Sequence, residues 1–167
     1  SQIMKAIDDD FETFRLMAIQ LARDNDLTPY QLKESEFGRY RSIAKLKVYH
    51  SQAHFLEELA LFIKGHNKLY TSSGIKTLQY FTSNIYSFSE HWDEYDFNHL
   101  INDIPNFGFS PSGAYLYKDK SPDRQAVITY PWSNNTGRFG TIIGLINIDY
   151  FNNLLKHSSS NLNNAFF

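Results

Sequence analysis

The sequence predicts an α+β protein in which a long N-terminal helix packs on an antiparallel sheet of about five strands. Over the first 24 residues, apolar side chains recur every three or four positions, as on one face of a helix. From residue 56 onward the apolar spacing changes to two, which is the period of a β-strand. Short turns separate the later strands, and strands joined by short turns run antiparallel.

The N-terminal helix presents one apolar stripe, and its charged residues fall mostly off that stripe. The stripe consists of Ile3, Ile7, Phe11, Phe14, Ala18 and Leu21. Burying one such side chain contributes roughly 1.5–3 kcal/mol, but ordering the backbone of each residue costs about 1–2 kcal/mol. The helix therefore needs a larger body to pack on. No N-cap precedes the helix and the chain opens with Ser1, so we expect both to continue upstream.

The remaining elements are predicted from caps, periodicity and turn residues. Thr28 and Pro29 suit the N-cap and the first turn of a helix. A nearly unbroken β-branched run predicts a central strand buried on both faces, and Pro131 should end the strand before it. The predicted ranges are a helix at 37–51, a hairpin at 56–73, an ambiguous aromatic-rich segment at 75–88, a helix at 93–104, strands at 114–118, 126–130 and 141–148, and a helix at 149–157.

These elements divide the chain into three segments. Residues 1–52 form an N-terminal helical segment, and residues 53–157 form the sheet domain. Residues 158–164 are nearly all serine and asparagine, which is a linker composition. The apolar residues 165–167 resemble the start of another strand, so we expect residues 158–167 to lead into a following module.

Composition excludes several classes of function. The 167 residues include 16 Lys and Arg against 18 Asp and Glu, a net charge of −2, with no basic block for binding nucleic acid. The absence of cysteine removes disulfides, thiolate zinc sites and cysteine nucleophiles. No apolar run is long enough to cross a bilayer, and no GxSxG, HExxH, P-loop or dinucleotide motif occurs. We therefore expect neither an enzyme nor a bound cofactor.

Several stretches resemble extracellular Cache sensor domains, which have a PAS-like sheet. The first is the hairpin, in which Glu57–Ile63 is followed by Lys68–Gly74. The second is Gly140–Asp149, which is similar to the last Cache strand, a glycine-bearing apolar run that ends in an acidic residue before a short helix. The opening segment, Gln20–Asp24 through Thr28–Tyr30, looks like that of membrane-bound regulators in Gram-positive bacteria.

The resemblance implies the membrane-distal half of a double Cache module, held at the cell membrane by its parent protein, with this portion outside the cell. The parent would be a histidine kinase of a two-component system or an AraC-type transcription regulator. The implied function is a sensor module that binds a small molecule or a partner protein and transmits a change through the N-terminal helix. A homodimer is compatible with this arrangement, and we expect no nucleic acid to bind this portion.

The family's amino-acid-binding members carry an Arg, a Trp-Tyr pair and a downstream Asp around the pocket. Here Trp92 has no Arg near it and no Tyr directly after it. Asp149 is the only position that the resemblance carries over. The sequence therefore argues against an amino-acid ligand.

Four aromatic residues of the last strands are candidate ligand-binding residues. Tyr115 and Tyr117 share one face of a strand by the period-two rule, and Tyr130 and Trp132 follow on the next strand. Rings with polar tips can line a small-molecule pocket. The alternative is a packed sheet face under the N-terminal helix.

Asp149 is the fifth candidate. At the end of an apolar strand, its carboxylate would meet a cationic or amine ligand at a pocket rim. The alternative is the N-cap of the closing helix, because Asp accepts backbone N–H bonds well at that position. Arg124 follows a turn and is expected to be solvated.

Two further groups have a structural interpretation beside a chemical one. His50 and His54 have the spacing of metal ligands on one helix, but we expect a break between helix and strand there and predict no metal site. Asp93, Glu94 and Asp96 crowd a helix start, where the helix dipole favours acidic residues. The alternatives for this acidic group are cation binding and acid–base chemistry.

Two other functions stay open. One is an intracellular PAS-like module that dimerises through the same helix and binds no ligand; a transmembrane span upstream of Ser1 would decide against it. The other is a hydrolase with carboxylate chemistry. Unchanged rates in Asp93→Asn, Glu94→Gln and Asp149→Asn variants would exclude the hydrolase.

Overall fold

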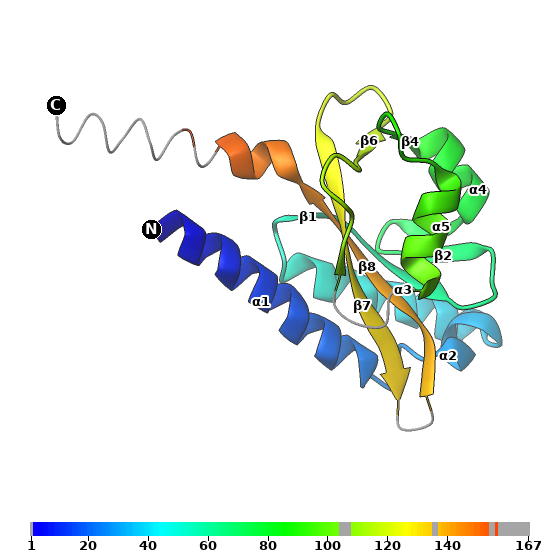
Figure 1. Ribbon diagram of the computed structural model, residues 1–167. Coiled ribbons are helices and arrows are strands. Elements are labelled where there is room, and N and C mark those ends of the chain that lie inside the picture. The colour runs from blue at the N-terminus through cyan, green and yellow to red at the C-terminus, as the bar shows by residue number, and fades with distance from the viewer. Residues whose placement is uncertain (1, 104–107, 135–136, 154–155, 157–167) are drawn as a thin grey trace, which may run out of the picture.

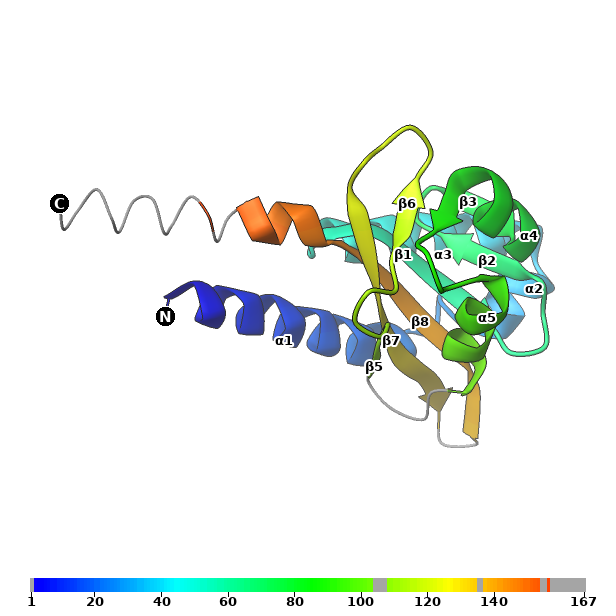
Figure 2. The same cartoon turned by 45° about the horizontal axis from the view of Figure 1, so that its top comes forward.

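The computed structural model describes residues 2–103, 108–134, 137–153 and 156 (Figures 1 and 2). The helices are α1 Gln2–Ala22, α2 Pro29–Lys33, α3 Glu36–Ser51, α4 Leu78–Tyr80, the π-helical turn η1 Phe81–Ile85 and α5 Glu94–Asp103. The strands are β1 Leu56–Ile63, β2 Lys68–Thr71, β3 Gly74–Thr77, β4 Tyr86–Phe88, β5 Gly108–Phe109, β6 Leu116–Lys118, β7 Arg124–Asn134 and β8 Gly137–Asn147. Residues 148–153 are helical and follow β8 directly.

The α+β class is confirmed, but the sheet is larger than the predicted five strands. Eight strands form one curled antiparallel sheet in the order β3-β2-β1-β8-β7-β6-β4, with β5 paired to β7. The strands that the sequence did not indicate are β3, β4 and β5. They are two to four residues long, which is too short for a period of two to stand out.

Strand β8 is the centre of the sheet, as its β-branched run predicted. It lies between β1 and β7 and is buried from Gly140 to Ile146. A Cβ at Gly144 would lie 2.7 Å from Cγ2 of Ile128 and 2.9 Å from the ring of Phe14. Glycine at this position therefore lets the ring of α1 approach the strand closely.

Strand β7 continues through Pro131, and the prediction that this proline ends the strand is wrong. Pro131 pairs with Thr141 of β8, and the ladder continues to Asn134 after a bulge. Beyond Thr129, which pairs with Gly108 of β5, the only described neighbour of β7 is β8. A proline whose nitrogen faces an open side of a strand removes no ladder hydrogen bond, so this position tolerates it.

The first face of the sheet is covered by α1, α2 and α3. Phe14, Ala18 and Leu21 are fully buried there, as the apolar stripe predicted, together with side chains of β1, β7 and β8. Phe11 is only partly buried and meets the ring of Phe109 at 5.0 Å between centroids. The side chains of the remaining stripe residues, Ile3 and Ile7, lie outside the described residues.

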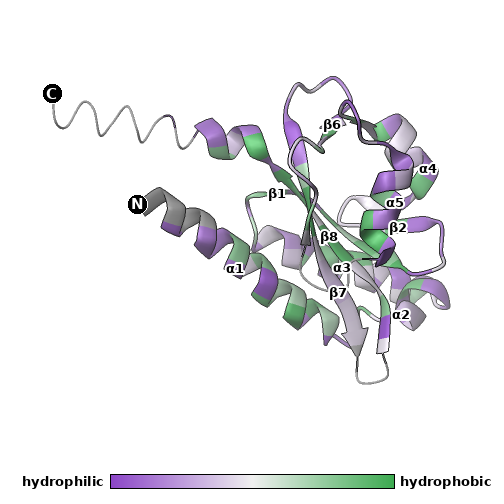
Figure 3. Ribbon diagram, viewed as in Figure 1, coloured by the Kyte–Doolittle hydropathy of each residue, from purple (hydrophilic) through white to green (hydrophobic). Residues whose placement is uncertain are grey.

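The second face is covered by α4, η1, α5 and loops. A separate apolar cluster forms there, in which Phe97, Leu100 and Ile101 of α5 pack on Val127, Ile143 and Leu145 of the sheet. Figure 3 shows the two faces meeting at a hydrophobic β8, with hydrophilic residues on the outer sides of the helices. Alternate residues of one strand thus support α1 on one side and α5 on the other.

The N-terminal helices belong to the same core as the sheet. Leu32 of α2 and Leu46 of α3 are buried beside Leu59 and Leu61 of β1. The predicted cap is confirmed, because the Thr28 hydroxyl accepts a hydrogen bond from the Gln31 N–H at 3.2 Å. The boundary at residue 52 stays a prediction, and the predicted linker 158–167 lies outside the described residues.

Among the described residues, no helix combines the length and the apolar character needed to span a membrane.

Candidate functional site

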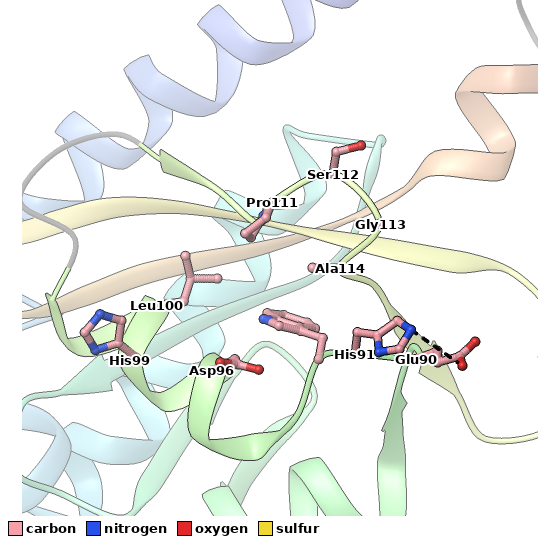
Figure 4. A pocket seen from close by; sticks show the side chains of 10 residues that line it. Glu90, His91, Asp96, His99, Leu100, Pro111, Ser112, Gly113 and Ala114 are labelled. Atoms are coloured by element: carbon pink, nitrogen blue, oxygen red, sulfur yellow. Dashed lines mark ion pairs between the residues drawn. The ribbon is translucent and has the colours of Figure 1, made fainter.

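A hollow of about 520 Å³ opens on the second face of the sheet (Figure 4). Three segments form it: the loop after β4, the helix α5, and the turn before β6. Its lining residues are Glu90, His91 and Trp92 of the loop, Asp96, His99 and Leu100 of α5, and Pro111 to Ala114 of the turn. We call this site the Trp92 hollow. Its volume is within the range of small-molecule pockets.

The apolar floor of the hollow belongs to the core of the second face. Trp92 is only 8% exposed, and its indole packs edge-to-face on Phe88 at 5.4 Å and on Phe97 at 6.1 Å. Leu100 and Ala114 are also buried. No described residue accepts a hydrogen bond from the Trp92 indole N–H, although a buried tryptophan usually finds such a partner.

The rim of the hollow is fixed by hydrogen bonds between its two loops. The Ser89 N–H donates to the Tyr115 carbonyl, and the Tyr115 N–H donates to the Ser89 hydroxyl oxygen, each at 2.9 Å. The Ser89 hydroxyl in turn donates to the Gly113 carbonyl at 2.9 Å. His91 and Gly113 have φ values of 68° and 84°, so both loops turn sharply at the rim.

The start of α5 places one carboxylate in the hollow. The Asp93 carboxylate accepts the Asp96 N–H at 3.0 Å, and the Asp96 carboxylate accepts the Asp93 N–H at 3.1 Å, which is a reciprocal cap. This confirms the structural interpretation of the acidic group. Only one oxygen of Asp96 is engaged in the cap, and Asp96 lines the hollow, so the second oxygen can accept another donor.

The five residues that the sequence singled out lie in two separate places. Tyr117 pairs with Arg124 at one end of β7, and Tyr115 lies beside them under the Arg124 guanidinium, 5.2 Å from ring centroid to Cζ. Tyr130 lies six residues further along β7, and Trp132 lies beyond it. A strand rises about 3.3 Å per residue, so the two groups are about 20 Å apart.

At the first of these places, Asp149 is bound by Arg124. Its carboxylate accepts the Arg124 backbone N–H at 2.7 Å and the Nη2 of the guanidinium at 2.8 Å. The N-cap interpretation of Asp149 is wrong, because the helix begins one residue earlier and the Asn147 side chain accepts the Tyr150 N–H. Arg124 is also less solvated than expected, since only 35% of its side chain is exposed.

The side-chain hydrogen bond from Arg124 holds the pKa of Asp149 below its usual value. The guanidinium therefore already occupies the carboxylate that was expected to meet a ligand.

At the second place, the two aromatic residues differ. Trp132 is fully buried in the core of the first face and contacts Phe139 at 4.8 Å. Tyr130 is partly exposed and lines a hollow of about 590 Å³ near the end of α1, together with Arg23 and Asp24. Their role in ligand binding stays a prediction.

A third polar group lies where α3 meets the turn between β2 and β3. The Ser72 hydroxyl donates to the Glu58 carboxylate at 2.7 Å and lies 2.7 Å from His50 Nδ1. His50 Nε2 donates to the Leu56 carbonyl at 2.8 Å. Both ring nitrogens of His50 are thus engaged. In the part of the chain that the structure describes, no cluster of three metal-binding side chains occurs.

Comparison with solved structures identifies the fold. The sensory domain of the Campylobacter jejuni chemoreceptor Tlp3 with isoleucine bound is 17% identical, with a TM-score of 0.56 over 92% of this chain and 60% of that chain. The ligand-binding domain of the same chemoreceptor in complex with L-valine is 16% identical, with a TM-score of 0.53 over the same shares, 92% and 60%. The chain has the fold of a bacterial sensory domain.

A third solved structure, a domain of a sensory box/GGDEF family protein from Vibrio parahaemolyticus, is 14% identical, with a TM-score of 0.50 over 92% of this chain and 62% of that one. The chain therefore spans about three fifths of the length of these structures. No protein-family model matches the chain, and no curated protein matches it. The likeness concerns the fold alone.

The sequence analysis did not select the Trp92 hollow as a site. Trp92 entered only as a departure from the amino-acid-binding pattern, and Asp96 only as part of an acidic helix start. The available signal was the grouping of an aromatic residue, acids and histidines within 90–99, followed by the Gly- and Pro-bearing turn at 111–114. Only the fold brings these two segments together.

Proposed function

We propose that this chain is a sensor module of a transmembrane signalling receptor, and that it binds a small molecule in the Trp92 hollow. The observation that carries the proposal is the hollow itself, where the indole N–H of Trp92 and one carboxylate oxygen of Asp96 have no partner among the described residues. The solved sensory domain with this fold that has isoleucine bound supports a small-molecule ligand.

The path from the hollow to α1 crosses a single strand. Ile143 and Leu145 of β8 pack in the cluster that contains Trp92, whereas Gly144 lies directly under Phe14 of α1. A ligand that shifts α5 therefore acts on the strand that supports α1. Such small displacements of packed helices are a known means of transmission.

The arrangement of the ends suits a membrane receptor. The start of α1 and the helical segment 148–153 lie at the same end of the molecule in both views (Figures 1 and 2). Two helices at one end of the molecule are compatible with a receptor that meets a membrane on that side. The extracellular location and the parent type, a histidine kinase or an AraC-type regulator, rest on the resemblance to Cache domains and belong to the proposal.

A ligand-library thermal-shift screen with two matched tryptophan variants tests the proposal. We expect Trp92→Phe to lose the shift of a hit compound, whereas Trp132→Phe, on the opposite face, keeps it. The reverse result would move the binding site to the residues that the sequence singled out. If no compound shifts the wild-type protein, the ligand-binding proposal fails and the dimerisation module without a ligand becomes the better explanation.

A further inference from the structure

Carboxylates and histidines, but no lysine or arginine, line the Trp92 hollow among the described residues, and Oε1 of Glu90 lies 3.6 Å from Nε2 of His91 (Figure 4). Between Lys76 and Lys118 the chain contains five acidic residues and no lysine or arginine. Two of those acids, Glu90 and Asp96, line the hollow, and none of its described lining residues is lysine or arginine. The whole chain is nearly neutral at −2, so this segment is unusually acidic.

The acidic rim surrounds an apolar floor. Trp92, Leu100 and Ala114 supply buried apolar surface, and Pro111 also lines the hollow. Glu90 has 89% of its side chain exposed, so it contributes charge at the entrance, whereas Asp96 is partly buried. An apolar body can therefore lie against the indole while a positive charge faces the carboxylates.

A carboxylate on the ligand would be repelled in this hollow. An anion in this hollow faces two carboxylates and has no lysine or arginine partner among the described lining residues. Two unit charges of like sign at close range repel each other even in water, and they repel more strongly where water is excluded.

We propose that the Trp92 hollow binds a small organic cation, an amine with an apolar body and no carboxylate. The proposal rests on the proposed sensor function and names the ligand class for that site. The ammonium group lies near Asp96 and Glu90, the apolar body covers Trp92 and Leu100, and the indole N–H is free to donate to an acceptor on the ligand or to a water molecule.

Matched pairs of ligands test the proposal directly. Isobutylamine and valine share an ammonium group and a side chain and differ by the carboxylate, as do 2-methylbutylamine and isoleucine. Titration calorimetry of the wild-type chain should show each amine binding about tenfold or more tightly than its matched amino acid. Equal or tighter binding of the amino acids would overturn the proposal.

Three carboxylate variants locate the charge effect. Glu90→Gln and Asp96→Asn should each weaken amine binding about fivefold or more. Glu94→Gln is the control, because Glu94 lies in the first turn of α5 but does not line the hollow. Asp96 also caps α5, so a melt without ligand should accompany that variant. Glu90 has no capping role, and unchanged amine affinity in Glu90→Gln and in a folded Asp96→Asn would contradict the proposal.

The failure of this proposal is distinct from the failure of the sensor function. If amines, choline and tetramethylammonium do not bind while an anionic or zwitterionic compound does, the amine class is wrong and the sensor function stands. If no class of compound binds, both proposals fail.

Discussion

The two faces of the central sheet are built from the same strands but closed in different ways. The first face is sealed by the 21-residue helix α1 together with α3, and its largest side chains, such as Phe14 and Trp132, are fully buried. The second face is covered by the 10-residue helix α5 and by loops, and its hollow of about 520 Å³ reaches the buried side chains of Trp92 and Leu100. The hollow of about 590 Å³ on the first face lies at the end of α1 and is lined by partly or fully exposed residues. The long helix covers its face through its C-terminal half, where Phe14, Ala18 and Leu21 are fully buried.

Unpartnered polar groups occur on both faces, because the buried indole N–H of Trp132 in the core of the first face has no partner among the described residues. The Trp92 hollow differs in that its unpartnered groups line an open cavity. At the edge of the sheet beside α3, the hydroxyl of Ser72 links Glu58 to His50, so each polar group has a partner. In the Trp92 hollow, the indole N–H and one Asp96 oxygen have no described partner. Satisfied buried groups stabilise a fold, whereas unused ones at a cavity are available to a ligand.

The largest loss of folding stability is expected on the first face, under α1. Phe14→Ala should lower the free energy of unfolding by about 3–5 kcal/mol, because the ring is fully buried and rests on Gly144. Phe11 belongs to the same apolar stripe but is only partly buried, so Phe11→Ala should cost about 1–2 kcal/mol. Urea denaturation measures both. A cost for Phe14→Ala below about 1 kcal/mol would show that α1 is not clamped on the sheet.

A matched leucine pair compares the two faces directly. Leu21 of α1 is fully buried, whereas Leu100 of α5 is 7% exposed and lines the hollow. Leu21→Ala should cost about 3–5 kcal/mol, and Leu100→Ala about 2–3 kcal/mol, since water can enter the enlarged hollow but not a sealed cavity. Urea melts of both variants with equal m-values make the comparison valid. An equal cost would mean that the second face is as closed as the first.

Much of the fold followed from the sequence because long elements repeat their signal. The apolar stripe of α1 extends over several helical turns, and β8 has an uninterrupted apolar run. The sequence therefore predicted both elements and which of their side chains are buried. The two-residue strand β5 has too few positions to show a period, and the pairing of Pro131 depends on which strands border β7. Those features are decided by tertiary neighbours rather than by local pattern.

The candidate site was predicted less well for a related reason. Tyr115 and Tyr130 were grouped because they lie on consecutive strands, but Tyr115 lies beside Arg124 at the start of β7, whereas Tyr130 lies six residues further along that strand. The hollow instead joins residues 90–100 to the turn 111–114, and hydrogen bonds from Ser89 hold those segments together. Contacts of this kind depend on how the chain crosses the sheet, which spacing along the sequence does not encode.

A smaller loss of folding stability is expected when the hydroxyl of Ser72 is removed. Ser72→Ala removes the hydroxyl between Glu58 and His50 and leaves both partly buried partners without it, which should cost about 1–3 kcal/mol. Ser73→Ala is the control, because the exposed Ser73 also donates to Glu58, at 3.1 Å, but water can replace it. We expect a cost of about 0.5 kcal/mol or less there in urea melts. Equal costs would show that the network does not depend on burial.

The smallest expected effect concerns Asp149, whose pKa is lowered by the hydrogen bond from Arg124. A carboxylate with a lowered pKa in the folded protein stabilises it at pH values above about 3.9, the value of an unfolded Asp, and this stability is lost as the pH falls further. Asp149→Asn should therefore cost about 1 kcal/mol or less at pH 7, since the pair is partly exposed.

The cost of Asp149→Asn should shrink below about pH 4, as urea melts between about pH 3 and pH 7 would show. Asp119→Asn, at an exposed aspartate with no ion pair among the described residues, is the control for the change from Asp to Asn. A cost that does not change with pH would mean that the guanidinium does not hold the carboxylate. In that case Asp149 would be free to meet a ligand, as the sequence alone suggested. The Arg124–Asp149 pair could then no longer be contrasted with the open Trp92 hollow as a site whose carboxylate is already occupied.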